Sequence, residues 1–249
     1  MLHPAHLLRL ATIALLAGRA WQHIFWDSAL VHVPMPAPLT SLWLSVAIGA
    51  ILAILALLLA LPGRHLHRLY AWLPPVAAVL LGDALIAAHM HHWALPECIE
   101  HSLQWGTPLG LWLLHRGRET QAWRLLRLCA ALTFAGHGLY ALGWPEPTPT
   151  HFLAMTQQIL GFLPATAHTF LQLAGSLDLL VCVGIFVPRL APVALLYATC
   201  WGLLTALARP VAYFDDADML LALHRWLPEM VFRLPHGLVP LALLRQLRH

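Results

Sequence analysis

The sequence predicts an all-α integral membrane protein, a bundle of about eight transmembrane helices with both termini in the cytoplasm. Of the 249 residues, 60% are hydrophobic and only 10% are charged, which is too few charges to cover a water-soluble surface. The apolar residues form blocks close to the ~20 residues that a helix needs to cross a lipid bilayer. The basic residues are all arginines, and they lie mainly between these blocks.

The apolar blocks give the order of the predicted spans. They cover residues 7–26, 39–61, 69–89, 98–114, 125–143, 167–187, 190–208 and 229–245. The first block is interpreted as a helix and not as a signal peptide, because it carries Arg19, is followed directly by Asp27 and lacks a small-residue cleavage pattern. The second block is uncharged and stops at Pro62 and Gly63, a pair that ends helices.

Two connections outside the spans also have predicted structures. Three prolines within residues 145–149 cannot enter a helix interior, so this stretch is expected to form a stiff external connection. Before the last block, Asp215, Asp216 and Asp218 precede the mostly apolar stretch 219–227. Acidic side chains cap and stabilise the N-terminus of a helix, so a short surface helix is expected there.

Loop charges predict the topology. Arginines fall on alternate connections, starting with the N-terminal side of the first span, whereas the opposite loops around residues 27–38, 90–97 and 144–166 contain none. Cytoplasmic loops carry an excess of basic residues, so the arginine-rich side is expected to be cytoplasmic. The predicted location is therefore the bacterial cytoplasmic (inner) membrane, as a multi-pass protein.

Composition also excludes two function classes. A net charge of +3 carried by dispersed arginines does not indicate a nucleic-acid partner. The four cysteines include no CxxC pair, so neither a disulfide framework nor a dithiol redox motif is indicated. The expected partners are the lipid bilayer and, for a redox function, a quinone or a periplasmic redox protein.

Polar residues inside the spans point to a site near the outer face of the membrane. At about 1.5 Å per residue, several of them lie roughly 5 to 10 Å below the outer ends of their helices. Charged groups at this depth normally pair inside the bundle or line a wet cavity. The site is predicted to comprise Arg19, His23, Asp83, His101, His137 and His236.

Imidazoles and carboxylates without nearby thiolates favour iron, zinc or Cu(II) over Cu(I). Helical spacing places Arg19, His23 and Asp27 on one stripe, and the hairpin near residues 89–101 combines several histidines with Glu97 and Glu100. The candidate metal ligands are His23, Asp83, His89, His91, His92, His101 and His137.

Five other interpretations stay open. Histidines on two helices would also suit haem, and Arg19, His137 and His236 would suit a quinone headgroup. The polar layer would alternatively be an ion-pair network that only locks the helices together. A transporter should carry polar groups through the whole membrane, whereas only Asp178 lies near the midplane. A scaffold subunit of a membrane complex would use the outer histidines to contact a periplasmic partner.

Two stretches resemble the DoxX-like membrane protein family. They are Thr133–Tyr140, which reads TFAGHGLY, and Leu173–Leu180, which reads LAGSLDLL and leads to Gly184 and Phe186. The resemblance covers residues of about 125–208 and implies a four-helix family unit in residues 121–249, with residues 1–120 as an added four-helix half. It also implies a redox neighbourhood, because the family includes the membrane subunit of a thiosulfate-oxidising, quinone-reducing complex. The expected function is therefore that of a membrane protein with a redox or metal-dependent role, for which a link to quinone is one alternative. No enzymatic reaction is assigned.

Overall fold

The computed structural model describes residues 3–26, 28–32, 38–63, 66–215 and 217–247, and these residues form helices and turns without strands. The predicted all-α fold is therefore confirmed for the described chain. The helices are α1 (Pro4–Phe25), η1 (Ala29–His32), α2 (Pro38–Ala60), α3 (Leu66–Tyr70), α4 (Leu73–Met90), α5 (Leu95–Glu100), α6 (Ser102–His115), α7 (Glu119–Leu142), α8 (Thr150–Leu160), α9 (Pro164–Gly184), α10 (Ala191–Ala212), α11 (Met219–Arg233) and α12 (Pro235–Gln246).

Five helical segments are long and apolar enough to cross a membrane: Ser41–Ala60, His67–Met90, Glu119–Leu142, Pro164–Gly184 and Ala191–Ala212. Helices occupy the other three predicted spans as well, but α1, α6 and the α11–α12 pair do not meet the same criteria of length and composition. The described chain is therefore that of a membrane protein with five candidate spans. The predicted total of eight transmembrane helices stays a prediction.

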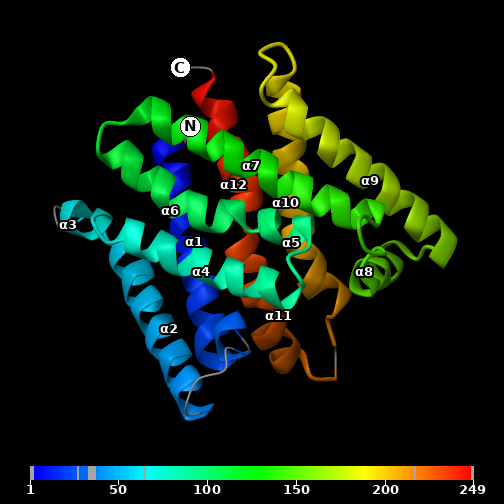
Figure 1. Cartoon of the computed structure of the whole chain (residues 1–249), viewed down its shortest axis with the longest axis horizontal. Helices are drawn as coiled ribbons and strands as arrows, with labels where there is room; N and C mark the ends of the chain where they lie inside the picture. Colours follow the sequence, from blue (N-terminus) through cyan, green and yellow to red (C-terminus); the bar gives the residue numbers. More distant parts are fainter. Residues whose placement is uncertain (1–2, 27, 33–37, 64–65, 216, 248–249) are drawn as a thin grey trace.

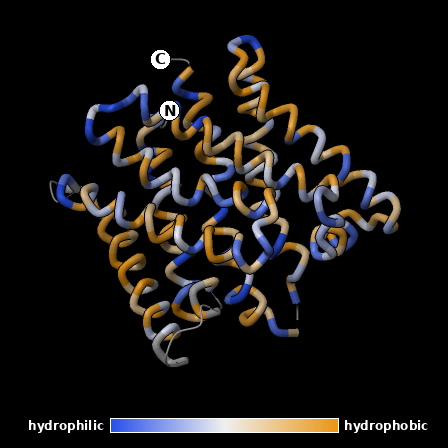
Figure 2. Tube along the Cα trace, viewed as in Figure 1, coloured by the Kyte–Doolittle hydropathy of each residue, from blue (hydrophilic) through white to orange (hydrophobic). Residues whose placement is uncertain are grey.

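The outer surface of these helices is apolar, as a lipid-facing surface requires. Leu57 of α2, Leu180 of α9 and Val193 of α10 are 65%, 68% and 71% exposed. Figure 2 shows hydrophobic residues along the lengths of the helices and hydrophilic residues at several of the turns. Such exposure would be costly in water, so the helices are suited to a surrounding of lipid tails.

Turn chemistry explains several boundaries. The helix α7 ends at Gly143, whose φ of +76° is a conformation that glycine adopts without strain. Residues 145–149 stay outside helices, as predicted, and α8 follows them as a helix that the sequence did not predict. The side chain of Asp218 accepts a hydrogen bond from the backbone N–H of Leu221 and caps α11, as expected, while Asp216 lies outside the described residues.

The C-terminal span has a different form from the predicted single helix. The predicted surface helix continues through Arg233 as α11, and a new helix, α12, begins at Pro235. Proline lacks a backbone N–H and its ring clashes with the preceding turn, so it starts helices readily and breaks them in the interior. Arg233, the last residue of α11, and His236, the second residue of α12, therefore lie on the two sides of this junction.

Packing brings the two ends of the chain together. α1 packs against α2, α6, α11 and α12, and α10 packs against α11 and α12. Figure 1 shows the start of α1 and the end of α12 at the same edge of the molecule. The division into halves at residue 120 stays a prediction, but the first helix is packed directly against the last two.

Candidate functional site

The site is built around α5, a short helix that begins at the tight turn after α4. Pro96 occupies its first turn, where the missing N–H of proline costs nothing, and Glu97 and His101 follow at a spacing of one helical turn. The Nε2 atom of His101 lies 3.3 Å from Oε1 of Glu97 and 3.3 Å from Oε1 of Glu100. One ligand atom of each of these three residues lies within 4.8 Å of the other two, so they are close enough to bind one metal ion.

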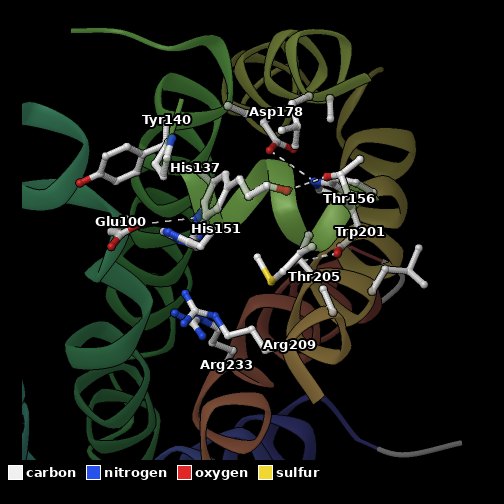
Figure 3. A pocket seen from close by; sticks show the side chains of 18 of the residues that line it. Glu100, His137, Tyr140, His151, Thr156, Asp178, Trp201, Thr205, Arg209 and Arg233 are labelled. Carbon is white, nitrogen blue, oxygen red and sulfur yellow. Dashed lines mark hydrogen bonds and ion pairs between the residues drawn. The ribbon is translucent and has the colours of Figure 1, made fainter. Parts of the chain in front are cut away.

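Two histidines from other helices lie beside this group of possible metal ligands. His137 on α7 has its Nδ1 atom 3.6 Å from Oε2 of Glu100, and its ring centroid lies 5.3 Å from that of His236 on α12. The Nε2 atoms of both histidines are buried without a hydrogen-bond partner among the described residues. We refer to Glu97, Glu100, His101, His137 and His236 as the histidine–glutamate cluster. Figure 3 shows Glu100 and His137 facing each other at one side of a cavity.

Glycines let the three helices approach closely enough to form this cluster. A Cβ atom on Gly136 of α7 would lie 2.8 Å from the N, Cα and Cβ atoms of Glu100. A Cβ atom on Gly202 of α10 would overlap with the carbonyl oxygen of His236. Real Cβ atoms are not found at such distances, so larger residues at either position would push α5 or α12 away.

Neighbouring polar groups hold Glu97 in its ionised form. Glu97 is only 8% exposed, and Tyr140 of α7 donates a hydrogen bond to its Oε2. Burial raises the pKa of this carboxyl, but hydrogen bonds from His101 and Tyr140 outweigh burial and lower the pKa to about 2. A carboxylate that is ionised at neutral pH is ready to bind a cation without first losing a proton.

Arg19 of α1 connects to the same cluster through α6. Its Nε atom donates to Oε1 of Gln104 at 3.0 Å, and Nε2 of Gln104 lies 3.1 Å from Nδ1 of His101. The guanidinium also donates to Gln22 at 2.6 Å and lies over the ring of Phe232, 4.4 Å from its centroid. These contacts fix the orientation of His101 from the side opposite to the carboxylates.

The predicted residues His23 and Asp83 form a second, separate group. The Nε2 atom of His23 lies 2.8 Å from Oδ2 of Asp83, and its Nδ1 atom lies 3.0 Å from Oγ of Ser45. Ser45 also contacts Ser28 at 2.8 Å. Both ring nitrogens of His23 are therefore satisfied within this group, an arrangement that favours a structural lock between α1, α2 and α4. Asp27, which was expected on the same stripe, lies outside the described residues.

The remaining predicted ligands are His89, in the last turn of α4, and His91 and His92, on the turn that follows it. His89 and His92 are exposed, and the ring of His89 packs against Trp93 at 5.7 Å. His91 is exposed too, but it borders the cavity beside the cluster. The structure thus brings His101, His137 and His236 together. It places His89, His91 and His92 at the rim of the cavity or farther from the cluster.

A cavity of about 610 Å³ adjoins the cluster and extends between α8, α9 and α10. Glu97, Glu100, His137 and His236 line one part of it, and Asp178 with Trp201 lines another. The residues on the apolar side of this cavity include Phe152, Met155, Ile159, Leu160, Phe170 and Leu171. Figure 3 shows the polar side chains converging on the cavity from several helices. Pockets of this size and mixed lining are typical of sites for small organic ligands.

An arginine pair that the sequence reasoning did not select also borders the cavity. Arg209 at the end of α10 and Arg233 at the end of α11 both bind Oε2 of Glu229, at 2.7 and 2.6 Å. Glu229 and Arg233 are four residues apart, which places them on one face of α11, but this spacing does not show that Arg209 of α10 packs against them. One feature of the sequence does distinguish Arg209. It follows the predicted span 190–208 on the outer side, where the positive-inside rule leads one to expect few arginines.

Comparison of the chain with protein-family models, with curated proteins and with solved structures finds no match. The assignment of a function therefore depends on the geometry of the site. The resemblance of residues 125–208 to the DoxX-like family stays a prediction.

Proposed function

We propose that this protein is a metal-dependent membrane protein whose histidine–glutamate cluster binds one transition-metal ion next to a ligand cavity. The observation that carries the proposal is the pair of imidazoles of His137 and His236, whose buried Nε2 atoms have no hydrogen-bond partner in the described chain. A buried polar atom without a partner costs about 1 to 3 kcal/mol. Coordination of a metal would remove this cost at both rings.

The donor set selects the class of metal. Three imidazoles and two carboxylates, without a thiolate, suit iron, zinc or Cu(II). Haem uses at most two axial protein ligands, so it would leave the carboxylates of Glu97 and Glu100 unexplained. Among the ions, we favour iron, because combinations of histidine and carboxylate on facing helices are the usual ligands of non-haem iron. Such a centre would support the redox function that we expect in the bacterial inner membrane.

Transport is the second candidate, and one observation favours it. The cavity that begins at the cluster also reaches Asp178, a buried carboxylate in the middle of α9 that binds Trp201 Nε1 at 3.3 Å. A polar group at that depth is expected of a substrate path. Uptake of the metal into vesicles that contain the purified protein would favour transport over a resident metal centre.

Metal content tests the main proposal. Wild-type protein and the variants His137→Ala and His236→Ala are purified in detergent and measured by mass spectrometry for metals, with circular dichroism as a check on folding. The control is His168→Ala, because His168 is exposed on α9. We expect about one metal ion per chain in the wild-type and control proteins and a strong loss of metal in both cluster variants. Loss of a group that only supports a ligand lowers metal affinity roughly 10- to 100-fold, and loss of a ligand itself should lower it at least as much.

The same experiment has clear opposing outcomes. A wild-type protein that takes up neither iron, zinc nor copper, even after chelation and reloading, would overturn the proposal. Retention of full metal content in both cluster variants would place the metal elsewhere. Loss of helical content only in the cluster variants would instead support a structural role for the two histidines.

A further inference from the structure

Two arginines at the cavity share a single carboxylate. Glu229 is the only acidic residue in an ion pair with Arg209 or Arg233 within the described chain, so the group retains one net positive charge. All three side chains are about one-fifth exposed, and both arginines line the cavity. Figure 3 shows the two guanidinium groups side by side, on the same side of the cavity as His137 and Glu100. A surplus positive charge in this half-buried setting favours an anionic ligand group.

The apolar part of the same cavity reaches the surface. Ile159 and Leu160 on α8 are 40% and 44% exposed, and Leu204 on α10 is 59% exposed, yet all three line the cavity. α9 and α10 are candidate membrane spans, so this rim faces the region that lipid tails would occupy. One face of α8 forms the adjoining wall, because its lining residues recur at the spacing of a helical turn. A ligand can therefore enter from the lipid phase.

The volume limits the size of that ligand. A cavity of about 610 Å³ lies within the range of roughly 300–1,000 Å³ that is typical of pockets for single small organic molecules. A single long acyl chain with its carboxylate belongs to this size class, whereas a two-chain phospholipid has more than twice as many atoms. One net positive charge also matches one carboxylate.

We infer that the cavity binds a long-chain carboxylate, a single-chain fatty acid or a molecule of that chemical class. Its carboxylate binds Arg209 and Arg233, and its tail lies along the apolar wall of α8, α9 and α10. The other carboxylates at the cavity have partners of their own. Glu97 accepts a hydrogen bond from Tyr140, and Glu97 and Glu100 each lie 3.3 Å from Nε2 of His101. Asp178 accepts hydrogen bonds from Trp201 and Tyr197 at 3.3 and 3.4 Å. A role of the long-chain carboxylate as a substrate rests on the proposed metal centre, but the binding of this ligand to the cavity does not.

Binding of radiolabelled hexadecanoate to the protein in phosphatidylcholine nanodiscs tests the inference. Arg209→Gln should weaken binding about tenfold or more, because it removes a charge-assisted bidentate donor. Glu229→Gln should strengthen it, since both guanidinium groups are then free of a competing carboxylate. The matched control is Arg189→Gln, because Arg189 is exposed on the turn after α9. Ala174→Phe, which fills the buried apolar wall and leaves the arginines in place, should also weaken binding.

Competitors separate the possible ligands. Unlabelled hexadecanoate should displace the label, whereas hexadecanol and phosphatidylglycerol in the nanodisc should not. Equal competition by hexadecanol would show that the arginines do not select the carboxylate headgroup. Competition by phosphatidylglycerol would show that the site takes two-chain lipids. Either result overturns the inference. Unchanged binding in both Arg209→Gln and Ala174→Phe would do so too. His137→Ala should lose metal but keep hexadecanoate, so failure of the metal proposal is distinguishable.

Discussion

Gly136 offers the sharpest test of how the cluster is assembled. In Gly136→Ala, the new methyl group would lie 2.8 Å from three atoms of Glu100. It needs at least 3.4 Å for ordinary van der Waals contact, so α5 and α7 must separate by about 0.6 Å. Metal–ligand distances tolerate deviations of only about 0.2 Å. The shift therefore moves Glu100 out of coordinating position relative to His137.

Two quantities should change in Gly136→Ala. Metal affinity, measured by competition with a chromophoric chelator, should fall about 10- to 100-fold, as for other changes that misplace a ligand. The free energy of unfolding should fall by about 1 to 3 kcal/mol through overpacking, partly offset by the ~1 kcal/mol that alanine contributes over glycine in a helix. Thermal unfolding in detergent measures the second quantity.

Gly82→Ala is the matched control. Gly82 lies within α4, and nothing lies within 4 Å of the position of its added Cβ. This variant should gain helix propensity and keep its metal affinity. If Gly136→Ala matched Gly82→Ala in both stability and metal affinity, the close approach of α5 and α7 would not be what positions Glu100, and the reasoning would be refuted.

Two other predictions follow from the structure. Asp83→Ala should lower the free energy of unfolding by about 1 to 3 kcal/mol, because it leaves Nε2 of His23 buried without its hydrogen-bond partner, while metal content per folded chain stays unchanged. Loss of metal without loss of stability would instead show that His23 and Asp83 belong to the metal site. In a cysteine-free background, Arg118→Cys should react with a membrane-impermeant thiol reagent only after permeabilisation, and Glu146→Cys should react in intact cells; the reverse pattern would contradict the proposed topology.

Part of the candidate site was accessible from the sequence. Ionisable residues inside apolar stretches are rare and costly, so His101, His137 and His236 could be selected without knowing their neighbours. The sequence could not show that Glu100 lies against His137, nor that His23 pairs with Asp83 in a separate group. Helical periodicity predicts which face of a helix a residue occupies, but it does not predict which other helix packs against that face.

The sequence by itself determined the helical class and the presence of helices long and apolar enough to span a membrane, because length, hydropathy and the effect of proline are properties of single segments of the chain. The tertiary structure alone decided which polar groups meet. Gly136 and Gly202 permit the approach of α5, α7, α10 and α12, and that approach creates the histidine–glutamate cluster and the cavity beside it. Such contacts depend on backbone distances of a few ångströms between segments far apart in the chain, and no local pattern encodes them.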